Sequence, residues 1–410
     1  MRDGSGITLT RRGALAAGSL AALSLSGCEQ PADPTQILTT LIDGPPMSRA
    51  PAAGIVLMKN NLVIAQAAVG EAAIDERIFT TRTALRAASI SKMIVALTTE
   101  KLHNDKVVDL DKGVRTWLPF FPSETAAGPD GPSLRALLSH TGGMKDPDVY
   151  WLALPGHMET LLTREAFRAD TNFEYCNLAY GVVAAALEAA TGRRFDWLAR
   201  DLILKQIGLD AGFNWSSVSP EKKQAGATLY RETQRGWFSQ TDDRDILNDP
   251  EPLFLKEDGA DLRDYVPGTN GTLFSPQGGL RANLMDLATI AARLKYAPEL
   301  VRPVWRLDVT ETNGVHDERY FTHFGTGVQT HPADESLWPG QEVWGHHGEA
   351  YGLYSGAWYA PALDLSFAYA VTGTPETPPA RSARHPALNT FTEVLMDAVL
   401  AAYAASPASK

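Results

Sequence analysis

The order of strand-like and helix-like patterns along the chain limits its fold more than any other feature of the sequence. Two apolar runs, residues 54–58 and 62–65, flank Asn60 and Asn61. Paired asparagines tolerate the positive φ of a tight turn, so a β-hairpin is predicted there. Strand-like runs return near the end of the chain, at residues 324–328, 343–346, 354–360 and 365–371. Strands at both ends with helices between them predict a mixed α/β (α+β) domain with a mostly helical domain inserted in it. The expected ranges are 46–105 and 270–405 for the mixed domain and 106–269 for the helical domain.

A helical pattern begins at Ser89, where apolar side chains recur every third or fourth residue. This spacing places them on one face of an α-helix. The clearest later helix is expected to begin near Asn177 and to end at Gly192, because glycine readily adopts the left-handed conformation that ends helices. Two further helices are expected at residues 283–295 and 387–402.

The net charge excludes one broad class of function. The chain carries a formal net charge of -11, whereas binding to phosphates needs a basic surface, so nucleic acid is not an expected partner. The two cysteines, Cys28 and Cys176, are too few for a disulfide-rich scaffold or for a zinc site of four thiolates. A length of 410 residues with 44% hydrophobic residues allows a sizeable core.

The first 28 residues resemble an export signal. Two adjacent arginines, typical of a twin-arginine signal, precede an apolar run through Leu25 that is shorter than the ~20 residues needed to span a bilayer. Residues 25–28 (Leu-Ser-Gly-Cys) resemble a bacterial lipobox, whose cysteine becomes lipidated. We therefore expect an exported, periplasmic protein anchored through Cys28, with a cleaved signal and an incidental cysteine as the alternative. Residues 29–45 are polar and contain prolines, so they are interpreted as a linker.

Ser89 and Lys92 are the first candidates for catalytic chemistry. A serine at a helix start lies over unpaired backbone N–H groups and the positive end of the helix dipole. A lysine three residues later lies one turn further on the same face, so a neutral amine there can activate the hydroxyl as a nucleophile. Taken alone, the pattern equally fits a capping serine, Ser89 or Ser91, beside a solvated lysine.

Two later segments supply polar side chains that could face the same cleft. Tyr175 and Asn177 stand at the entry to a predicted helix and offer a phenol and an amide, although a cap and a buried aromatic residue would give the same pattern. His346 and His347 precede Gly348 at the end of a predicted strand, where glycine lets a substrate backbone approach closely. Paired histidines also suggest a metal site, but no H-E-x-x-H spacing or suitable third ligand supports one.

In combination, these segments resemble the serine β-lactamase and penicillin-binding-protein superfamily. The matching motifs are Ser-x-x-Lys at 89–92, a Leu-Leu-Ser-His-Thr stretch within 134–143, Tyr-x-Asn at 175–177, Gly-Gly-Leu with Asp-Leu within 278–287, and His-x-Gly at 346–348. More narrowly, they resemble the branch of class C β-lactamases, D-alanyl-D-alanine carboxypeptidases, D-aminopeptidases and esterases. The resemblance covers about residues 50–400 and implies a β-lactamase-like antiparallel sheet flanked by helices, with an inserted helical domain.

The resemblance also implies catalytic roles. Ser89 would attack a carbonyl and form an acyl-enzyme, and Lys92 and Tyr175 would share the general-base role. Asn177 would hold the Lys92 amine and the amide of the substrate. The resemblance implies no cofactor and no metal.

The segment from His346 to Glu349 would contact the substrate. The backbone N–H groups of Ser89 and Glu349 would form the oxyanion hole. His346 stands where class C β-lactamases have lysine, and it is expected to be only partly charged near pH 7. His347 replaces a hydroxyl residue that commonly contacts a substrate carboxylate, and Gly348 completes the motif. Both departures favour an esterase or a D-peptidase over a dedicated β-lactamase.

The function expected from the sequence is therefore a serine hydrolase. Its substrate would be a small-molecule ester, a D-amino-acid amide or a peptidoglycan-derived compound, and membrane contact would occur only through the lipid anchor. Three alternatives stay open: β-lactamase activity, a non-catalytic cell-wall binding or sensing protein, and a metal-dependent hydrolase. Cys176, between two site residues, is expected to be a small buried apolar side chain.

Overall fold

The computed structural model describes residues 32–154, 156–240, 262–308, 310, 314 and 320–409. Pro31–Lys410 forms one compact unit, so the mixed and helical parts are regions of that unit, and their expected boundaries stay a prediction. The expected export signal and Cys28 lie outside the described residues. Among the described residues, no helix combines the length and the apolar character needed to cross a membrane.

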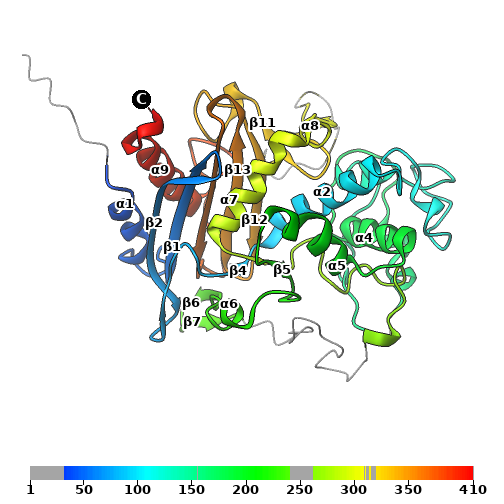
Figure 1. The fold of residues 1–410 in the computed structure, drawn as a ribbon, viewed down its shortest axis with the longest axis horizontal. Coiled ribbons are helices and arrows are strands. Elements are labelled where there is room, and N and C mark those ends of the chain that lie inside the picture. The colour runs from blue at the N-terminus through cyan, green and yellow to red at the C-terminus, as the bar shows by residue number, and fades with distance from the viewer. Residues whose placement is uncertain are drawn as a thin grey trace, which may run out of the picture. The chain divides into compact units, whose positions relative to one another are not determined.

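A nine-stranded antiparallel sheet is the centre of this unit (Figure 1). Strand β1, near the start of the chain, pairs with β14, near its end, so both ends of the chain build one sheet as the sequence predicted. In spatial order the strands are β3 (Arg77–Ile78), β2 (Leu62–Ala73), β1 (Ala52–Lys59), β14 (Leu365–Thr372), β13 (Leu353–Ala360), β12 (Val343–Ala350), β11 (Gln329–His331), β10 (His323–Phe324) and β9 (Trp305–Arg306).

Local sequence explains the first hairpin. Strands β1 and β2 are joined at Asn60 and Asn61, which have φ values of 52° and 61°. Most residues rarely adopt this left-handed conformation, and asparagine adopts it at low cost. The predicted hairpin is therefore confirmed. The strand expected at residues 324–328 is wrong beyond Phe324: β10 ends there, and residues 325–328 turn towards β11, with the Gly325 N–H donating to the carbonyl of Val328.

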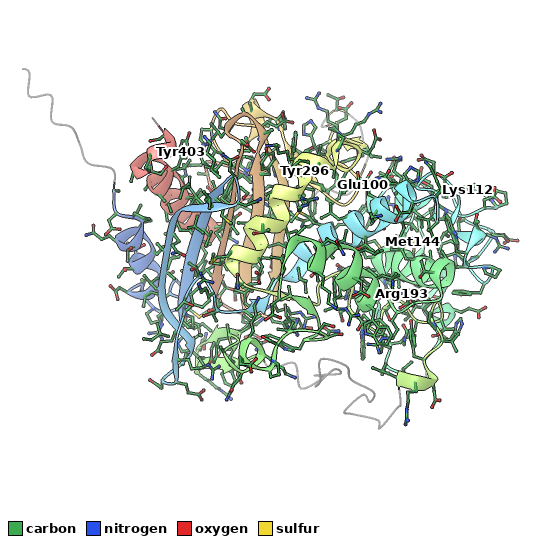
Figure 2. All side chains as sticks on the ribbon, viewed as in Figure 1. Glu100, Lys112, Met144, Arg193, Tyr296 and Tyr403 are labelled. Atoms are coloured by element: carbon green, nitrogen blue, oxygen red, sulfur yellow. The ribbon has the colours of Figure 1, made fainter. Side chains whose placement is uncertain are left out.

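Helices cover both faces of the sheet. Helices α1 (Pro34–Ile42) and α9 (Thr390–Ala405) pack on one face, where Leu38, Leu395 and Val399 join a buried apolar cluster with strand residues. Tyr403 of α9, labelled in Figure 2, packs edge-on against Trp338 at 5.2 Å. Helix α7 (Leu284–Ala292) covers the other face and belongs to the cluster that includes the helical region. Burial on both faces explains why β1 is apolar along nearly its whole length.

The expected linker at residues 29–45 is wrong over the part that the structure describes. Pro34 begins α1, and the Asp33 carboxylate caps it by accepting the Thr35 N–H at 2.9 Å. Leu38 and Leu41 are buried against the sheet and α9. The polar composition reflects the exposed side of a short helix, whereas its two leucines anchor the segment to the core.

The helical region surrounds helix α2, which begins after the 3-10 turn η1 (Ala88–Ile90). The expected helix near Asn177 is confirmed as α4, and Gly192 ends it with φ 67°. Two smaller sheets are also present. One has the order β4-β8-β5 and joins β5 of the helical region to two strands from the expected mixed-domain ranges, and the other is a hairpin of β6 and β7. The remaining elements are β4 (Leu85–Arg86), α2 (Ser91–Asn104), α3 (Leu134–Leu138), α4 (Leu178–Thr191), α5 (Phe195–Ala199), β5 (Gly212–Phe213), α6 (Pro220–Gln224), β6 (Tyr230–Thr233), β7 (Gly236–Ser239), β8 (Leu280–Ala282) and α8 (Pro298–Val301).

Candidate active site

Ser89 lies on the short turn η1 and faces a cavity of about 620 Å³. Ala88 before it has φ 51°, an unusual value for a non-glycine residue and a common sign of a constrained functional turn. The neighbouring Ser91 is fully buried, where its hydroxyl donates to the Ala88 carbonyl at 2.6 Å and accepts the Leu280 N–H at 3.0 Å. The structure therefore separates the two serines: Ser91 fixes the turn, and Ser89 is available to a ligand.

Lys92 is buried completely beneath Ser89. Its Nζ lies 3.1 Å from Ser89 Oγ, 2.8 Å from Asn177 Oδ1 and 3.0 Å from the carbonyl oxygen of Gln277. The amide and carbonyl oxygens can only accept hydrogen bonds. A neutral amine therefore spends its two N–H groups on them, and its lone pair is left for the proton of the Ser89 hydroxyl.

Burial lowers the pKa of Lys92 to about 7, although the nearby Asp146 and Cys176 act in the opposite direction. Removing an ammonium group from water disfavours its charged form. The lysine is therefore in its neutral form in a substantial fraction of molecules near neutral pH. The solvated lysine considered from the sequence alone is excluded by this burial.

The pH dependence of turnover follows from this pKa. Below about 7 the Lys92 ammonium has no lone pair, and above it the free amine accepts the serine proton, so kcat/KM should rise through an apparent pKa near 7. The measurement is a pH profile of ester hydrolysis in buffers of constant ionic strength. A profile that is flat through this range, or that falls as the pH rises, would contradict the assignment of Lys92 as the base.

Tyr175 lies on the other side of the nucleophile. It lines the same cavity as Ser89, its ring centroid lies 4.8 Å from that of Phe321 in a stacked arrangement, and Lys92 Nζ lies 4.7 Å from the centre of its ring. Burial raises the pKa of Tyr175 well above its ordinary value, so the residue is a neutral phenol at physiological pH. A neutral phenol can both donate and accept a proton, so Tyr175 is suited to relaying one. The sequence predicted that Tyr175 and Lys92 share the role of general base, and the lowered pKa of Lys92 makes it the better suited of the two.

Asp146 belongs to the site although it was not among the residues singled out from the sequence. Its carboxylate accepts the Asn177 Nδ2–H at 2.8 Å and the Leu178 backbone N–H at 2.8 Å, at the start of α4. The first contact fixes which end of the Asn177 amide faces Lys92, so Asp146 is a positioning residue. It comes from a loop of irregular structure, where no periodic pattern signals it.

His140 and Cys176 support the same segment from within the core. His140 Nδ1 accepts the Cys176 backbone N–H at 3.0 Å, and the imidazole ring lies 4.4 Å from the ring of Tyr175. Burial, followed by the charge of Lys92, holds the pKa of His140 well below its ordinary value. Cys176 is buried with a raised pKa, as expected of a small packed side chain.

Strand β12 brings the His-His-Gly-Glu segment to the cavity. His346 and His347 are both buried and both line the cavity, but adjacent strand residues point to opposite faces of a sheet. Gly348 faces η1, where a Cβ atom would lie 2.6 Å from the carbonyl oxygen of Ala87. A side chain at this position would push β12 away from the nucleophile turn, so the glycine is required for the approach of the two elements.

The expected partial charge of His346 is wrong. Burial, followed by the charge of Lys92, lowers the pKa of His346 to about 3, so the ring is neutral. Its Nδ1 lies 2.5 Å from the carbonyl oxygen of His347, which can only accept, so Nδ1 carries the proton. Nε2 is then a hydrogen-bond acceptor, and it has no partner among the described residues. His346 presents a lone pair where a lysine would present a cation.

The rim of the cavity is aromatic and contains charges of both signs. Glu349 lines it, and its carboxylate accepts the Tyr354 hydroxyl at 3.2 Å. Val149 and Tyr351 are exposed large apolar residues at this rim. The other charged and aromatic residues of the lining are Arg86, Asp148, Tyr150, Trp151, Arg231, Tyr320, Phe321 and Arg381. Within the described part of the chain, no group of three or more His, Cys, Asp or Glu residues is placed to hold a metal ion.

The fold and the geometry of the site are those of a protein of the β-lactamase type. The model of the Beta-lactamase family matches residues 38–390. The chain therefore belongs to this family.

Comparison with individual proteins gives more distant similarity. The chain is 28% identical over 165 residues to Penicillin-binding protein 4* of Bacillus subtilis (strain 168). This match covers 36% of the chain and only 34% of that relative. Among solved structures, D-amino acid amidase from Ochrobactrum anthropi SV3 has a TM-score of 0.65 at 16% identity, covering 90% of this chain and 96% of the amidase. A D-stereospecific amidohydrolase from Streptomyces sp. has a TM-score of 0.59 at 17% identity, covering 88% and 96%. At these identities the structures support the fold.

Proposed function

We propose that Ser89 is the nucleophile that is acylated by the substrate, and that Lys92, as the free amine, removes its proton. One observation carries this proposal: two obligate acceptors, Asn177 Oδ1 and the Gln277 carbonyl, occupy the N–H groups of a neutral Lys92. The lone pair is thereby directed to Ser89 Oγ at 3.1 Å. This is the arrangement of a nucleophile with an adjacent base.

The proton moves in a closed circuit. Ser89 Oγ bonds to the substrate carbonyl carbon as its proton passes to Lys92 Nζ, and the carbonyl oxygen becomes an oxyanion. The oxyanion collapses, the ester or amide bond breaks, and the proton reaches the leaving group through the Tyr175 hydroxyl. Water then attacks the acyl-enzyme, gives its proton back along the same route and restores the Ser89 hydroxyl. The backbone N–H groups of Ser89 and Glu349 would stabilise both oxyanions.

Amide and ester substrates without a carboxylate next to His346 suit this site best. A neutral imidazole with an unpartnered acceptor nitrogen gives no attraction to a carboxylate, but it accepts a hydrogen bond from an ammonium or amide N–H. The solved neighbours include an amidase crystallised with L-phenylalanine amide and a D-stereospecific amidohydrolase. These names, together with the aromatic rim, support a D-amino-acid amide or an uncharged ester as the substrate.

The test is a matched panel of substrates for the chain without its first 28 residues. We expect turnover of D-phenylalanine amide and of p-nitrophenyl acetate to exceed that of L-phenylalanine amide and of a chromogenic β-lactam. Faster turnover of the lactam would favour the β-lactamase alternative. Binding of these compounds without turnover of any of them would favour the non-catalytic alternative.

We further propose that the protein acts outside the cytoplasm, anchored by a lipid on Cys28. The twin-arginine-like pair and the lipobox-like residues 25–28 support this location. Incorporation of labelled palmitate into the full chain, and its loss in Cys28→Ala, would test it.

A further inference from the structure

Residues whose side chains lie on both faces of β12 line the cavity. Gln329 of β11 and His347 of β12 line it, together with Tyr320, whose ring lies 5.2 Å from the ring of His347. We call these three residues the back branch. Gln329 is opposite Gly345 in the β11–β12 register, so no side chain stands between Gln329 and His347, two residues further along β12.

The back branch contains buried polar atoms without partners. Gln329 is 1% exposed, and neither its Oε1 nor its Nε2 has a hydrogen-bond partner within the described part of the chain. His347 is 4% exposed, and its Nε2 is also unpartnered there. Leaving a buried polar group unpaired costs about 1–3 kcal/mol. Three such atoms belong to residues that line one cavity. They point to a polar group of a ligand as their hydrogen-bond partner.

A relay across three strands fixes the proton of His347. The Trp358 indole N–H donates to the Tyr369 hydroxyl at 3.4 Å, and that hydroxyl lies 3.2 Å from His347 Nδ1. Because indole only donates, the Tyr369 proton is free to be donated to Nδ1. Gly356 makes this reach possible, since a Cβ atom there would lie 2.4 Å from Tyr369 Cζ. A neutral His347 that accepts at Nδ1 carries its proton on Nε2, so this buried nitrogen is a hydrogen-bond donor without a partner among the described residues.

We propose that the back branch binds a second, uncharged carboxamide of the substrate, one that is not cleaved. The ligand carbonyl accepts from His347 Nε2–H and from Gln329 Nε2–H, and the ligand N–H donates to Gln329 Oε1. The substrate would then be peptide-like, with a scissile bond at Ser89 and another amide held behind β12. The assignment of this ligand as a substrate rests on the proposed function, whereas its binding does not.

The pairing of atoms favours a group that both donates and accepts, as a carboxamide does, over groups that only accept or that are apolar. A carboxylate only accepts, so it would leave Gln329 Oε1 facing a second oxygen. A methyl ketone would satisfy the donors and leave Oε1 unpaired. An apolar group would leave all three atoms without partners. Only a group that both donates and accepts completes the set.

The test is equilibrium binding to the Ser89→Ala variant, which keeps the cavity and removes the nucleophile. The probes are phenylbutanamide, the methyl ketone with the same phenylpropyl chain, and the corresponding carboxylate, titrated by ligand-observed NMR. We expect the amide to bind about tenfold more tightly than either analogue, as expected for one or two additional hydrogen bonds. Equal affinities, or tightest binding of the carboxylate, would overturn the proposal whatever the fate of Ser89 in catalysis.

A second set of variants tests whether Gln329 causes the preference for the amide. In Ser89→Ala/Gln329→Met, which keeps the length of the side chain and removes both polar atoms, the preference for the amide should fall to within about twofold. The matched control is Ser89→Ala/Gln341→Met, because Gln341 lies outside the cavity lining, and it should keep the full preference. A preference that survives Gln329→Met would overturn the proposal. If that variant does not fold, the ranking of the three probes on Ser89→Ala alone decides.

Discussion

Ser89→Ala should abolish turnover of esters and amides and remove labelling by a fluorophosphonate probe. The expected loss in kcat is on the order of 10⁴-fold or more, because the variant lacks the hydroxyl that contacts Lys92 Nζ and only the binding and oxyanion contacts are left. The measurement is the intact mass of the labelled protein, followed by mapping of the labelled peptide and by initial rates on the best ester. The unmodified chain should gain one adduct, on Ser89.

Ser91→Ala is the matched control for this experiment. It removes a hydroxyl two residues away that is fully buried and bonded to the Ala88 carbonyl and the Leu280 N–H. We expect a loss of stability of about 1–2 kcal/mol with labelling at Ser89 retained. Persistent turnover in Ser89→Ala, or an adduct on another residue of a folded sample, would show that the nucleophile has been assigned to the wrong group.

Lys92→Met should reduce kcat/KM by on the order of 10³-fold, in the range that general-base catalysis contributes. Methionine nearly matches the volume of lysine and removes the amine that contacts Ser89 Oγ at 3.1 Å. Lys92→Arg distinguishes a role of Lys92 as a base from a role as a positive charge. Arginine keeps a positive charge but does not lose its proton, so it should also be inactive if Lys92 acts as a base.

Lys101→Met provides the control on the same helix. Lys101 is exposed and pairs with Asp105 four residues later, so its substitution should leave rates and the pH profile unchanged. An active Lys92→Arg enzyme would instead mean that the charge of Lys92 is sufficient. In that case the base would have to be sought among the other groups at Ser89, with Tyr175 first.

Local sequence accounts for much of the fold. The Asn60-Asn61 hairpin and the end of α4 at Gly192 were predictable, because each depends on backbone conformations that few residue types adopt. Helix α1 was not predictable in the same way. Only two of its side chains, Leu38 and Leu41, are buried, so its stability comes from packing against β1, β2 and α9, and α9 is far away in the sequence.

The nucleophile and its base could also be predicted from local sequence. Ser89 and Lys92 are three residues apart at a helix start, and this spacing alone brings the amine to the hydroxyl. Tyr175 and Asn177 were found through their place in a motif. The structure then brings them to Lys92 through the packing of α4 beside α2. Asp146, which orients Asn177, had no sequence signal because its partners are set by a loop.

The sequence by itself determined the family, the order of the elements and the residues of the nucleophile motif, since these depend on residue type and short spacing. Only the tertiary structure decided the protonation of Lys92 and His346, because burial sets their pKa values and depends on residues distant in the chain. It also decided that His346 and His347 line one cavity from opposite faces of β12. Strand alternation separates two neighbours, but only the assembled sheet shows that both of them line one cavity together with Gln329, whose buried polar atoms lack partners among the described residues.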